Sequence, residues 1–341
     1  MATLYHRPLA LLYGSDARDA IADKRAGLLG GSPSIAFTQL ERIERGGKRI
    51  ARSIISYRDA GSLPDIEAPR AAVAGLNFLR PNLMGVVNVT PDSFSDGGEH
   101  SNPETAITHG RILVKEGAAF LDIGGESTRP GSDPVSAETE RARILSVIAA
   151  LRDTAPVSAD TRKAAIMADA VAAGAALIND VSALTFDTAA LATAARLGVP
   201  VILMHSQGDP KTMQADPRYD DVALDVYDML KARIAACEAA GIPRAKILAD
   251  PGIGFGKTFD HNLALLHQLT LFHGLGVPLV AGLSRKAFTG ALTGEKLARN
   301  RVMGSVGGAV QAALAGAQIL RVHDVKATRQ ALAVALAIAG V

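Results

Sequence analysis

The chain has 341 residues, a formal net charge of +2 and no long run of basic residues. This charge balance argues against nucleic acid or an anionic membrane surface as the main partner. Hydrophobic residues make up 48% of the sequence but aromatic residues only 4%, so we expect a large core of aliphatic side chains and alanine. The single cysteine, Cys237, cannot form an internal disulfide.

No segment of the sequence is typical of export or of membrane insertion. The apolar patch in residues 1–15 is too short and too interrupted for a signal peptide. The longest apolar run, residues 331–341, falls short of the roughly 20 residues that a membrane-spanning helix needs. We therefore expect a cytoplasmic protein.

Residues 1–80 differ in pattern from the rest and are predicted to form an N-terminal extension. Residues 34–43 and 48–57 are rich in alternating apolar side chains and flank the turn sequence ERGG, which predicts a β-hairpin. We expect this hairpin to pack on a larger domain, residues 81–341, and to cover its bottom. The extension carries no recognisable chemistry.

From residue 82 onward, short apolar runs alternate with amphipathic, helix-like segments. The runs are residues 83–88, 118–124, 156–160, 176–180, 199–205, 245–250, 277–284 and 317–323. Nearly continuous apolar strands are typical of a parallel sheet covered on both faces. Eight strand–helix units over about 260 residues predict an α/β fold, a (β/α)8 TIM barrel. A doubly wound open sheet is the alternative that strand counting leaves open.

Polar residues gather where these runs end, and this favours the barrel, whose active sites lie at that face. The residues are Asn88, Asp122, Asp160, Asn179, Asp180, His205, Asp250, Ser284, Arg321 and His323. Helix capping accounts for about half of them. His205 and Gln207 are as readily explained by loop structure as by function.

Residues 251–258, PGIGFGKT, imitate a phosphate-binding P-loop. The first glycine of that motif is replaced by Pro251, which has no N–H to offer a phosphate. The sequence therefore predicts a glycine-rich ligand loop after Asp250 rather than a nucleotide-hydrolysing site.

Two other loops carry cations that suit an anionic ligand. In residues 124–131, GGESTRPG, Arg129 would meet an anion and Thr128 would donate hydrogen bonds from a mobile lid. Arg285 and Lys286 open a predicted helix, where positive charge opposes the helix dipole, so an anion or an electron-rich ring is the expected partner.

The ends of other strands supply further candidate ligands. Arg321 and His323 are two residues apart on one strand and so share a face, which suits a phosphate or pyrophosphate. Asp160, Asn179 and Asp250 come from separate strand ends. They would either ligate a metal or match the donors and acceptors of a flat heterocycle, and the residues alone leave both readings open.

The segments together are similar to the dihydropteroate synthase family, the folate-pathway enzymes that sulfonamide drugs inhibit. The similar segments are residues 84–98, 122–131, 158–164, 178–184, 203–214, 248–258, 282–290 and 321–325. The resemblance implies a (β/α)8 barrel that condenses 6-hydroxymethyl-7,8-dihydropterin pyrophosphate with p-aminobenzoate. The products would be 7,8-dihydropteroate and pyrophosphate, the cofactor Mg²⁺, and the assembly a homodimer.

The resemblance also implies residue roles. The catalytic residues would be Asp160, Asp250, Lys286, Arg321 and His323. Asn179, together with Asp160, Asp250 and Lys286, would hold the pterin, and Met204 would contact the substrate. Asn88 would bind Mg²⁺ and, with Arg321 and His323, the pyrophosphate. Thr128, Arg129, Pro130, Phe255 and Ser284 would enclose p-aminobenzoate.

Residues 90–98 would form a second lid, which includes Thr90, Asp92, Phe94 and Asp96. One departure from the family pattern is Ser206, where many bacterial relatives have methionine. A methyltetrahydrofolate-dependent methyltransferase and a catalytically silent pterin-binding homologue are the alternatives. The first should lack the pyrophosphate-binding residues Arg321 and His323.

Overall fold

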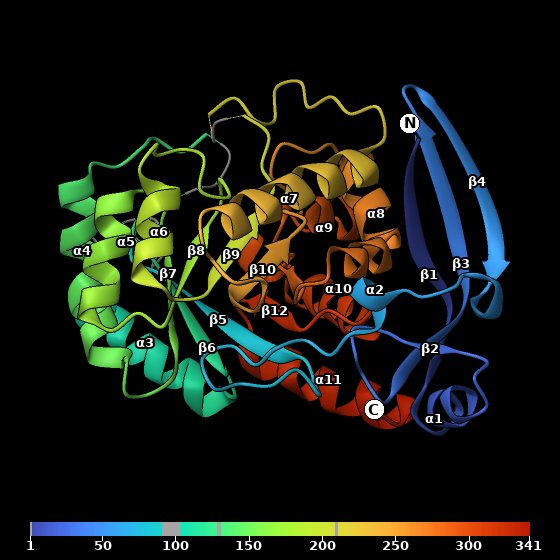
Figure 1. Cartoon of the computed structure of the whole chain (residues 1–341). Helices are drawn as coiled ribbons and strands as arrows, with labels where there is room; N and C mark the ends of the chain where they lie inside the picture. Colours follow the sequence, from blue (N-terminus) through green and yellow to red (C-terminus); the bar gives the residue numbers. More distant parts are fainter. Residues whose placement is uncertain (1, 91–102, 128–130, 209–210) are drawn as a thin grey trace.

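The computed structural model describes residues 2–90, 103–127, 131–208 and 211–341. It contains a barrel of parallel strands surrounded by helices, with an antiparallel sheet from the N-terminal part of the chain beside it (Figure 1). Among the described residues, no helix has the length and apolar character needed to cross a membrane.

The barrel contains a strand in each of the eight apolar runs. The strands are β5 (Asn82–Asn88), β6 (Phe120–Gly124), β7 (Val157–Asp160), β8 (Leu177–Asp180), β9 (Val201–Met204), β10 (Ile247–Asp250), β11 (Val280–Ala281) and β12 (Ile319–Val322). They pair in parallel in the order β10-β9-β8-β7-β6-β5-β12-β11. A single bridge between Ala249 and Leu279 joins the two ends of this order. The predicted TIM barrel is therefore confirmed.

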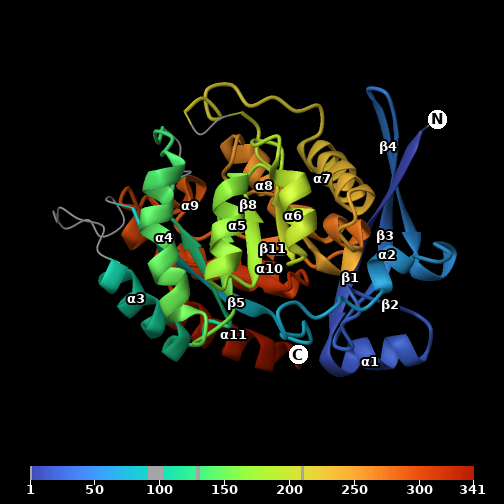
Figure 2. The same ribbon diagram turned by 60° about the vertical axis from the view of Figure 1, so that its left-hand side comes forward.

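Helices follow the strands and cover the outside of the barrel. They are α3 (Pro103–Glu116), α4 (Ala137–Leu151), α5 (Ala164–Ala173), α6 (Ala190–Leu197), α7 (Val222–Ala239), α8 (Phe259–His267), α9 (Ala287–Thr293), α10 (Val302–Leu314) and α11 (Val325–Ala339). Figure 2 shows α4, α5 and α6 side by side on this outer layer. Local capping fixes several starts: Asp221 accepts hydrogen bonds from the first turn of α7, and Thr258 forms a capping box with His261 on α8.

The interior of the barrel is layered because side chains two residues apart on a strand share a face. Its floor is one buried apolar cluster: Met84, Phe120, Leu177, Ile202, Leu248, Val280 and Ile319, with Val73 from the N-terminal part. Two positions further along four of these strands, the inward residue is polar: Asp122, Asn179, Asp250 and Arg321. The barrel thus directs this polar layer toward the carboxyl ends of its strands.

The N-terminal part forms a four-stranded sheet. Its elements are β1 (Thr3–Tyr13), α1 (Gly14–Ala22), β2 (Gly27–Leu28), β3 (Ile35–Gly46), β4 (Arg49–Ser56) and α2 (Pro64–Glu67). The predicted hairpin is confirmed, with β3 and β4 antiparallel and Gly46 opposite Arg49. The strand β1, which pairs with β3, was not predicted.

The sheet packs on the barrel, but on its side rather than under its bottom. Tyr5 donates to both carboxylate oxygens of Asp228 on α7, at 2.9 and 2.8 Å, and Arg45 pairs with Asp225 on the same helix. Figure 1 shows β1, β3 and β4 standing beside α7 and α8. The floor of the barrel is covered instead by Val73, which follows the sheet in the chain. The division at residue 80 stays a prediction.

Candidate functional site

A buried ion cluster lies in the polar layer of the barrel. The guanidinium of Arg321 on β12 reaches Asp122 on β6 at 2.5 Å and Asp160 on β7 at 2.8 Å. The side-chain amide of Asn179 on β8 donates to the same oxygen of Asp122 at 3.1 Å. Four strands therefore bring carboxylates, an amide and a guanidinium into contact at the centre of the barrel mouth.

The electrostatics of this cluster follow from burial. Burial and the neighbouring charge of Asp122 raise the pKa of Asp160, while Arg321 opposes the rise. Burial also works against the charge of Arg321, but the carboxylates of Asp122 and Asp160 outweigh it and raise the pKa of the guanidinium. The second oxygen of Asp122, Oδ1, is buried with no hydrogen-bond partner in the described part of the chain. A ligand N–H is the kind of group that would satisfy it.

Asp250 faces the cluster from the opposite side of the barrel. Its carboxylate accepts a hydrogen bond from the backbone N–H of Gly252 at 2.7 Å. Burial raises the pKa of Asp250, and the Gly252 N–H and the charge of Lys286 oppose that rise. The carboxylates of Asp160 and Asp250 are thus held on two sides of one polar space.

The two adjacent cations predicted after β11 find different partners. The ammonium of Lys286 lies 3.8 Å from the centre of the Phe255 ring. Arg285 has a left-handed backbone, φ 59°, and its guanidinium forms a two-point contact with Asp324 at 2.5 and 3.0 Å. The expectation of an electron-rich ring or an anion is therefore met within the chain, and only Lys286 is directed to the site.

Ser284 and His323 connect the ends of β11 and β12. The hydroxyl of Ser284 accepts a hydrogen bond from the backbone N–H of His323 at 3.2 Å and lies 3.1 Å from its ring nitrogen Nδ1. Asn88 is at the end of β5, opposite Gly124 of β6, and the following Thr90 is buried. Ser284 and His323 thus form a second polar pair at the ends of the strands.

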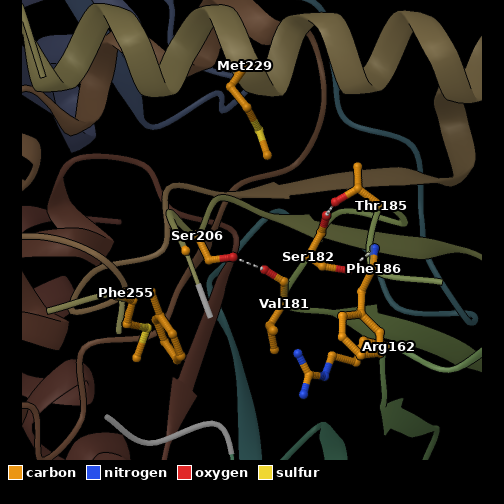
Figure 3. Close-up of a pocket in the computed structure, with 10 residues that line it drawn as sticks. Arg162, Val181, Ser182, Thr185, Phe186, Ser206, Met229 and Phe255 are labelled. Atoms are coloured by element: carbon orange, nitrogen blue, oxygen red, sulfur yellow. Dashed lines mark hydrogen bonds between the residues drawn. The ribbon is translucent and has the colours of Figure 1, made fainter. Parts of the chain in front are cut away.

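An apolar wall borders a small cavity over the ends of β8 and β9. The wall consists of Val181, Met204, Met213 and Phe255. The cavity has a volume of about 220 Å³ and also contacts Ser182, Thr185, Ser206, Gly208 and Met229. Figure 3 shows Arg162 against the ring of Phe186 on one side, with its guanidinium carbon 3.8 Å from the ring centre. Ser206 donates to the carbonyl of Val181 at 2.9 Å.

The structure brings most of the predicted site residues to one face of the barrel. The predicted lid residues Asp92, Phe94, Asp96, Thr128, Arg129 and Pro130 lie outside the described residues. Asp122 was predicted only as one of the polar strand ends and was assigned no ligand, although it is at the centre of the ion cluster. Its position two residues after the inward Phe120 was the available signal.

Comparisons with known proteins identify this face. A family described as pterin binding enzyme matches residues 84–323. The chain belongs to this family. The matched range includes β5 from Met84 onward, the other seven strands of the barrel and the whole polar cluster.

Relatives in this family are named dihydropteroate synthase. The protein from Escherichia coli K12 is 46% identical over 261 residues, which cover 76% of this chain and 92% of that protein. The protein from Neisseria meningitidis serogroup B is 51% identical and covers 75% of this chain and 92% of its own length.

Solved structures of dihydropteroate synthases are similar to this chain in fold and sequence. The Xanthomonas albilineans enzyme with 4-aminobenzoic acid has a TM-score of 0.75 and 50% identity, covering 80% of this chain and 99% of its own. The same enzyme with 7,8-dihydropteroate has a TM-score of 0.72. A Yersinia pestis enzyme in a sulfonamide complex has a TM-score of 0.74 and 46% identity, covering 78% of this chain and 97% of its own.

Proposed function

We propose that the chain is a dihydropteroate synthase that condenses 6-hydroxymethyl-7,8-dihydropterin pyrophosphate with p-aminobenzoate. The observation that carries this proposal is the buried polar cluster of Asp122, Asp160, Asn179, Asp250 and Arg321 at the barrel mouth. It lies within the range that matches the pterin-binding family. Relatives named dihydropteroate synthase are 42–51% identical over most of the chain.

The cluster suits a pterin better than a protein-held metal. A pterin presents ring and amino N–H donors next to carbonyl and ring-nitrogen acceptors, which match carboxylate acceptors and an amide that both donates and accepts. Asp160, Asn179 and Asp250 lie on separate strands and supply these groups. Among the described residues, no group of three or more His, Cys, Asp or Glu side chains is arranged to hold a metal.

The charges of the site support departure of pyrophosphate. Cleavage of the bond between the methylene carbon and the pyrophosphate oxygen leaves positive charge on the pterin and negative charge on the leaving group. Asp160 and Asp250 stabilise the first, and Arg321 and His323 stabilise the second. When pterin N–H groups bind Asp160, they replace Arg321 as its donor, and the guanidinium is released toward the pyrophosphate.

The amine nitrogen of p-aminobenzoate then forms the new bond to the methylene carbon and loses a proton. An arylamine is nucleophilic enough to react with the cationic carbon without an activated side chain. Phe255 and Ser284 line its place, and the ring of Phe255 is held by contact with Lys286. The same place would accept sulfonamides.

The described residues fit a Mg²⁺ ion that is held mainly by the substrate. Mg²⁺ usually keeps one or two protein oxygen ligands and takes the rest from phosphates and water. The amide oxygen of Asn88, at the end of β5, would be such a ligand. When bound, the ion supplies neutralisation of the charge that builds up on the pyrophosphate.

We also propose a cytoplasmic homodimer. Three large apolar side chains are strongly exposed on α10 and α11: Met303 at 79%, Val334 at 62% and Ile338 at 82%. The two helices pack against each other on the outside of the barrel. Contact with a second copy would remove this apolar area from water.

The decisive experiment mixes the protein with dihydropterin pyrophosphate, p-aminobenzoate and Mg²⁺ and measures pyrophosphate release. We expect release that depends on both organic substrates and a product identical to 7,8-dihydropteroate. Absence of turnover, or turnover that is independent of the arylamine, would contradict the proposal. A methyl-transfer assay with methyltetrahydrofolate tests the alternative and should give no reaction.

A further inference from the structure

The proposed chemistry uses neither Lys257, the lysine of the P-loop-like segment, nor His205 at the end of β9. They are in direct contact. The Lys257 ammonium nitrogen lies 2.9 Å from Nδ1 of His205 and 2.9 Å from the carbonyl oxygen of Phe255. It also lies 3.4 Å from the carbonyl oxygen of His205. The lysine is 2% exposed, so a cation on a glycine-rich loop has turned inward.

The number of acceptors matches the chemistry of this cation. An ammonium group has three N–H donors, and three acceptors surround Lys257. Burial and the charge of Lys257 lower the pKa of His205 to about 3, so its ring is neutral, and in the tautomer with the proton on Nε2 its Nδ1 accepts from the ammonium. Burial lowers the pKa of Lys257 to about 7, and the nearby carboxylate of Asp250 opposes that shift. Below about pH 7 the ammonium form prevails.

The loop that Lys257 holds is packed closely onto the end of β9. Gly252 has a φ of +69°, and a Cβ atom there would lie 1.8 Å from the carbonyl oxygen of His205. At Gly256 a Cβ would lie 2.5 Å from the carbonyl oxygen of Gln207. Only glycine allows this approach, which brings the Phe255 carbonyl within reach of the buried ammonium.

We propose that Lys257 is a positioning residue for the arylamine, because its ammonium ties the end of β9 to residues 251–258 and so fixes the ring of Phe255. That ring lies under the ammonium of Lys286 and forms part of the apolar wall with Val181, Met204 and Met213. Lys257 itself does not face the reacting atoms. Loss of its contacts would let Phe255 leave Lys286, whereas Asp160 and Asn179, on β7 and β8, would keep their places.

This role rests on the proposed function, and it predicts that loss of Lys257 changes the KM of one substrate and not that of the other. In Lys257→Met, assayed below about pH 7, we expect the KM for p-aminobenzoate to rise about tenfold. The KM for dihydropterin pyrophosphate should change by less than about twofold. Lys246→Met is the matched control, because Lys246 also donates to a backbone carbonyl, that of Gly198, at the opposite end of the barrel. It should leave both constants unchanged.

A double-mutant cycle tests whether the effect passes through Phe255. Phe255→Leu alone should also raise the arylamine KM, and adding Lys257→Met to it should raise that KM by less than about twofold more. Additive effects, equal changes in both KM values, or an unchanged arylamine KM in Lys257→Met would overturn the positioning role.

A second pair of variants covers the case in which Lys257→Met does not fold. In His205→Asn the side-chain oxygen replaces Nδ1 as acceptor, whereas His205→Leu removes it. We expect the arylamine KM to stay near the parent value in the first and to rise in the second, and equal values would overturn the role. An inactive parent protein would contradict the proposed function itself, while an active parent without these differences contradicts only the role of Lys257.

Discussion

Arg321 contacts both Asp122 and Asp160, and its contacts differ in character from an ordinary surface ion pair because all three side chains are buried or nearly so. Removal of such a partner leaves uncompensated carboxylates. We therefore expect two roles for this residue: it holds the two carboxylates together before substrate binds, and it acts on the leaving group in the proposed reaction. They are separable by experiment.

In Arg321→Ala we expect the barrier to pyrophosphate release to rise by about 2–4 kcal/mol, because one charge that stabilises the leaving group is lost. Steady-state kinetics measures this as kcat/KM for dihydropterin pyrophosphate. Circular dichroism should show an intact fold. Arg321→Lys retains the charge but not the two-point contact, and it should fall between the parent and the alanine variant. An alanine variant with unchanged turnover and binding would contradict the leaving-group role.

The titration of Lys257 makes the unfolding free energy depend on pH. An unfolded lysine keeps its proton up to about pH 10.5, whereas the folded Lys257 loses it near pH 7. Between these values the unfolded state binds more protons, so this residue makes the unfolding free energy rise with pH. The pH effect is lost as the pH falls through about 7.

We therefore expect the unfolding free energy of the parent, minus that of Lys257→Met, to increase between about pH 7 and pH 9.5. Urea denaturation at several pH values measures it. The comparison cancels the titration of other groups, provided that Asp250, Lys286 and His205, which surround the ammonium, are unchanged. A difference that is constant or decreases with pH would show that the lysine keeps an ordinary pKa.

At the scale of elements, the loop between β10 and α8 depends on backbone approach. Gly252 has a positive φ, contacts the carbonyl of His205, and donates its N–H to Asp250. Gly241 also has a positive φ, +93°, but a Cβ there would have no neighbour within 4 Å. Alanine substitution at Gly241 therefore measures the free-energy cost of the left-handed backbone alone. The same substitution at Gly252 adds the cost of steric overlap with the His205 carbonyl.

Gly241→Ala should lower the unfolding free energy by about 1–2 kcal/mol, the cost of a left-handed alanine. Gly252→Ala should lower it further and also weaken pterin binding, since the loop must move away from His205 and carries the donor to Asp250 with it. Denaturant titration gives the first quantity and calorimetry the second. Equal losses in the two variants would mean that the close approach at Gly252 is unimportant.

The elements also show what the sequence could predict. The barrel strands were predictable because each is an apolar run that ends in polar residues. The strand β1 was not, because Pro8 interrupts it and its alternation is weak. Its partner β3 is fixed by pairing across the sheet.

The candidate site was predictable where the local sequence places a residue, as it does for Arg321 near the end of β12. It was not where contacts join distant positions. Asp122 meets Arg321 across 199 positions and His205 meets Lys257 across 52. No local pattern records such contacts, so neither the ion pair of Asp122 with Arg321 nor the inward turn of Lys257 was predictable.

At the scale of the whole molecule, the exposed apolar side chains of α10 and α11 predict self-association. We expect the double variant Met303→Glu and Ile338→Glu to shift the protein from dimer to monomer, because burial of two carboxylates at an interface is costly. Light scattering after size-exclusion chromatography measures the mass. Leu79→Glu, on an exposed side chain outside these helices, is the control and should stay dimeric. A monomeric parent protein would contradict the proposed assembly.

The junction between β10 and β11 is the place where the barrel closes. Where the other neighbouring strands share a ladder, this pair is joined by the single bridge at Ala249 and Leu279. Asp250 lies directly after one side of this junction and Lys286 follows the other. A pterin held by both would connect the two edges, and the amide hydrogen of Ala249, which is bonded to the Pro278 carbonyl, should then exchange with solvent more slowly. Substrate binding would in this way stabilise the closure of the barrel. The ligand would join β10 to β11, whereas backbone hydrogen bonds join the other neighbouring strands.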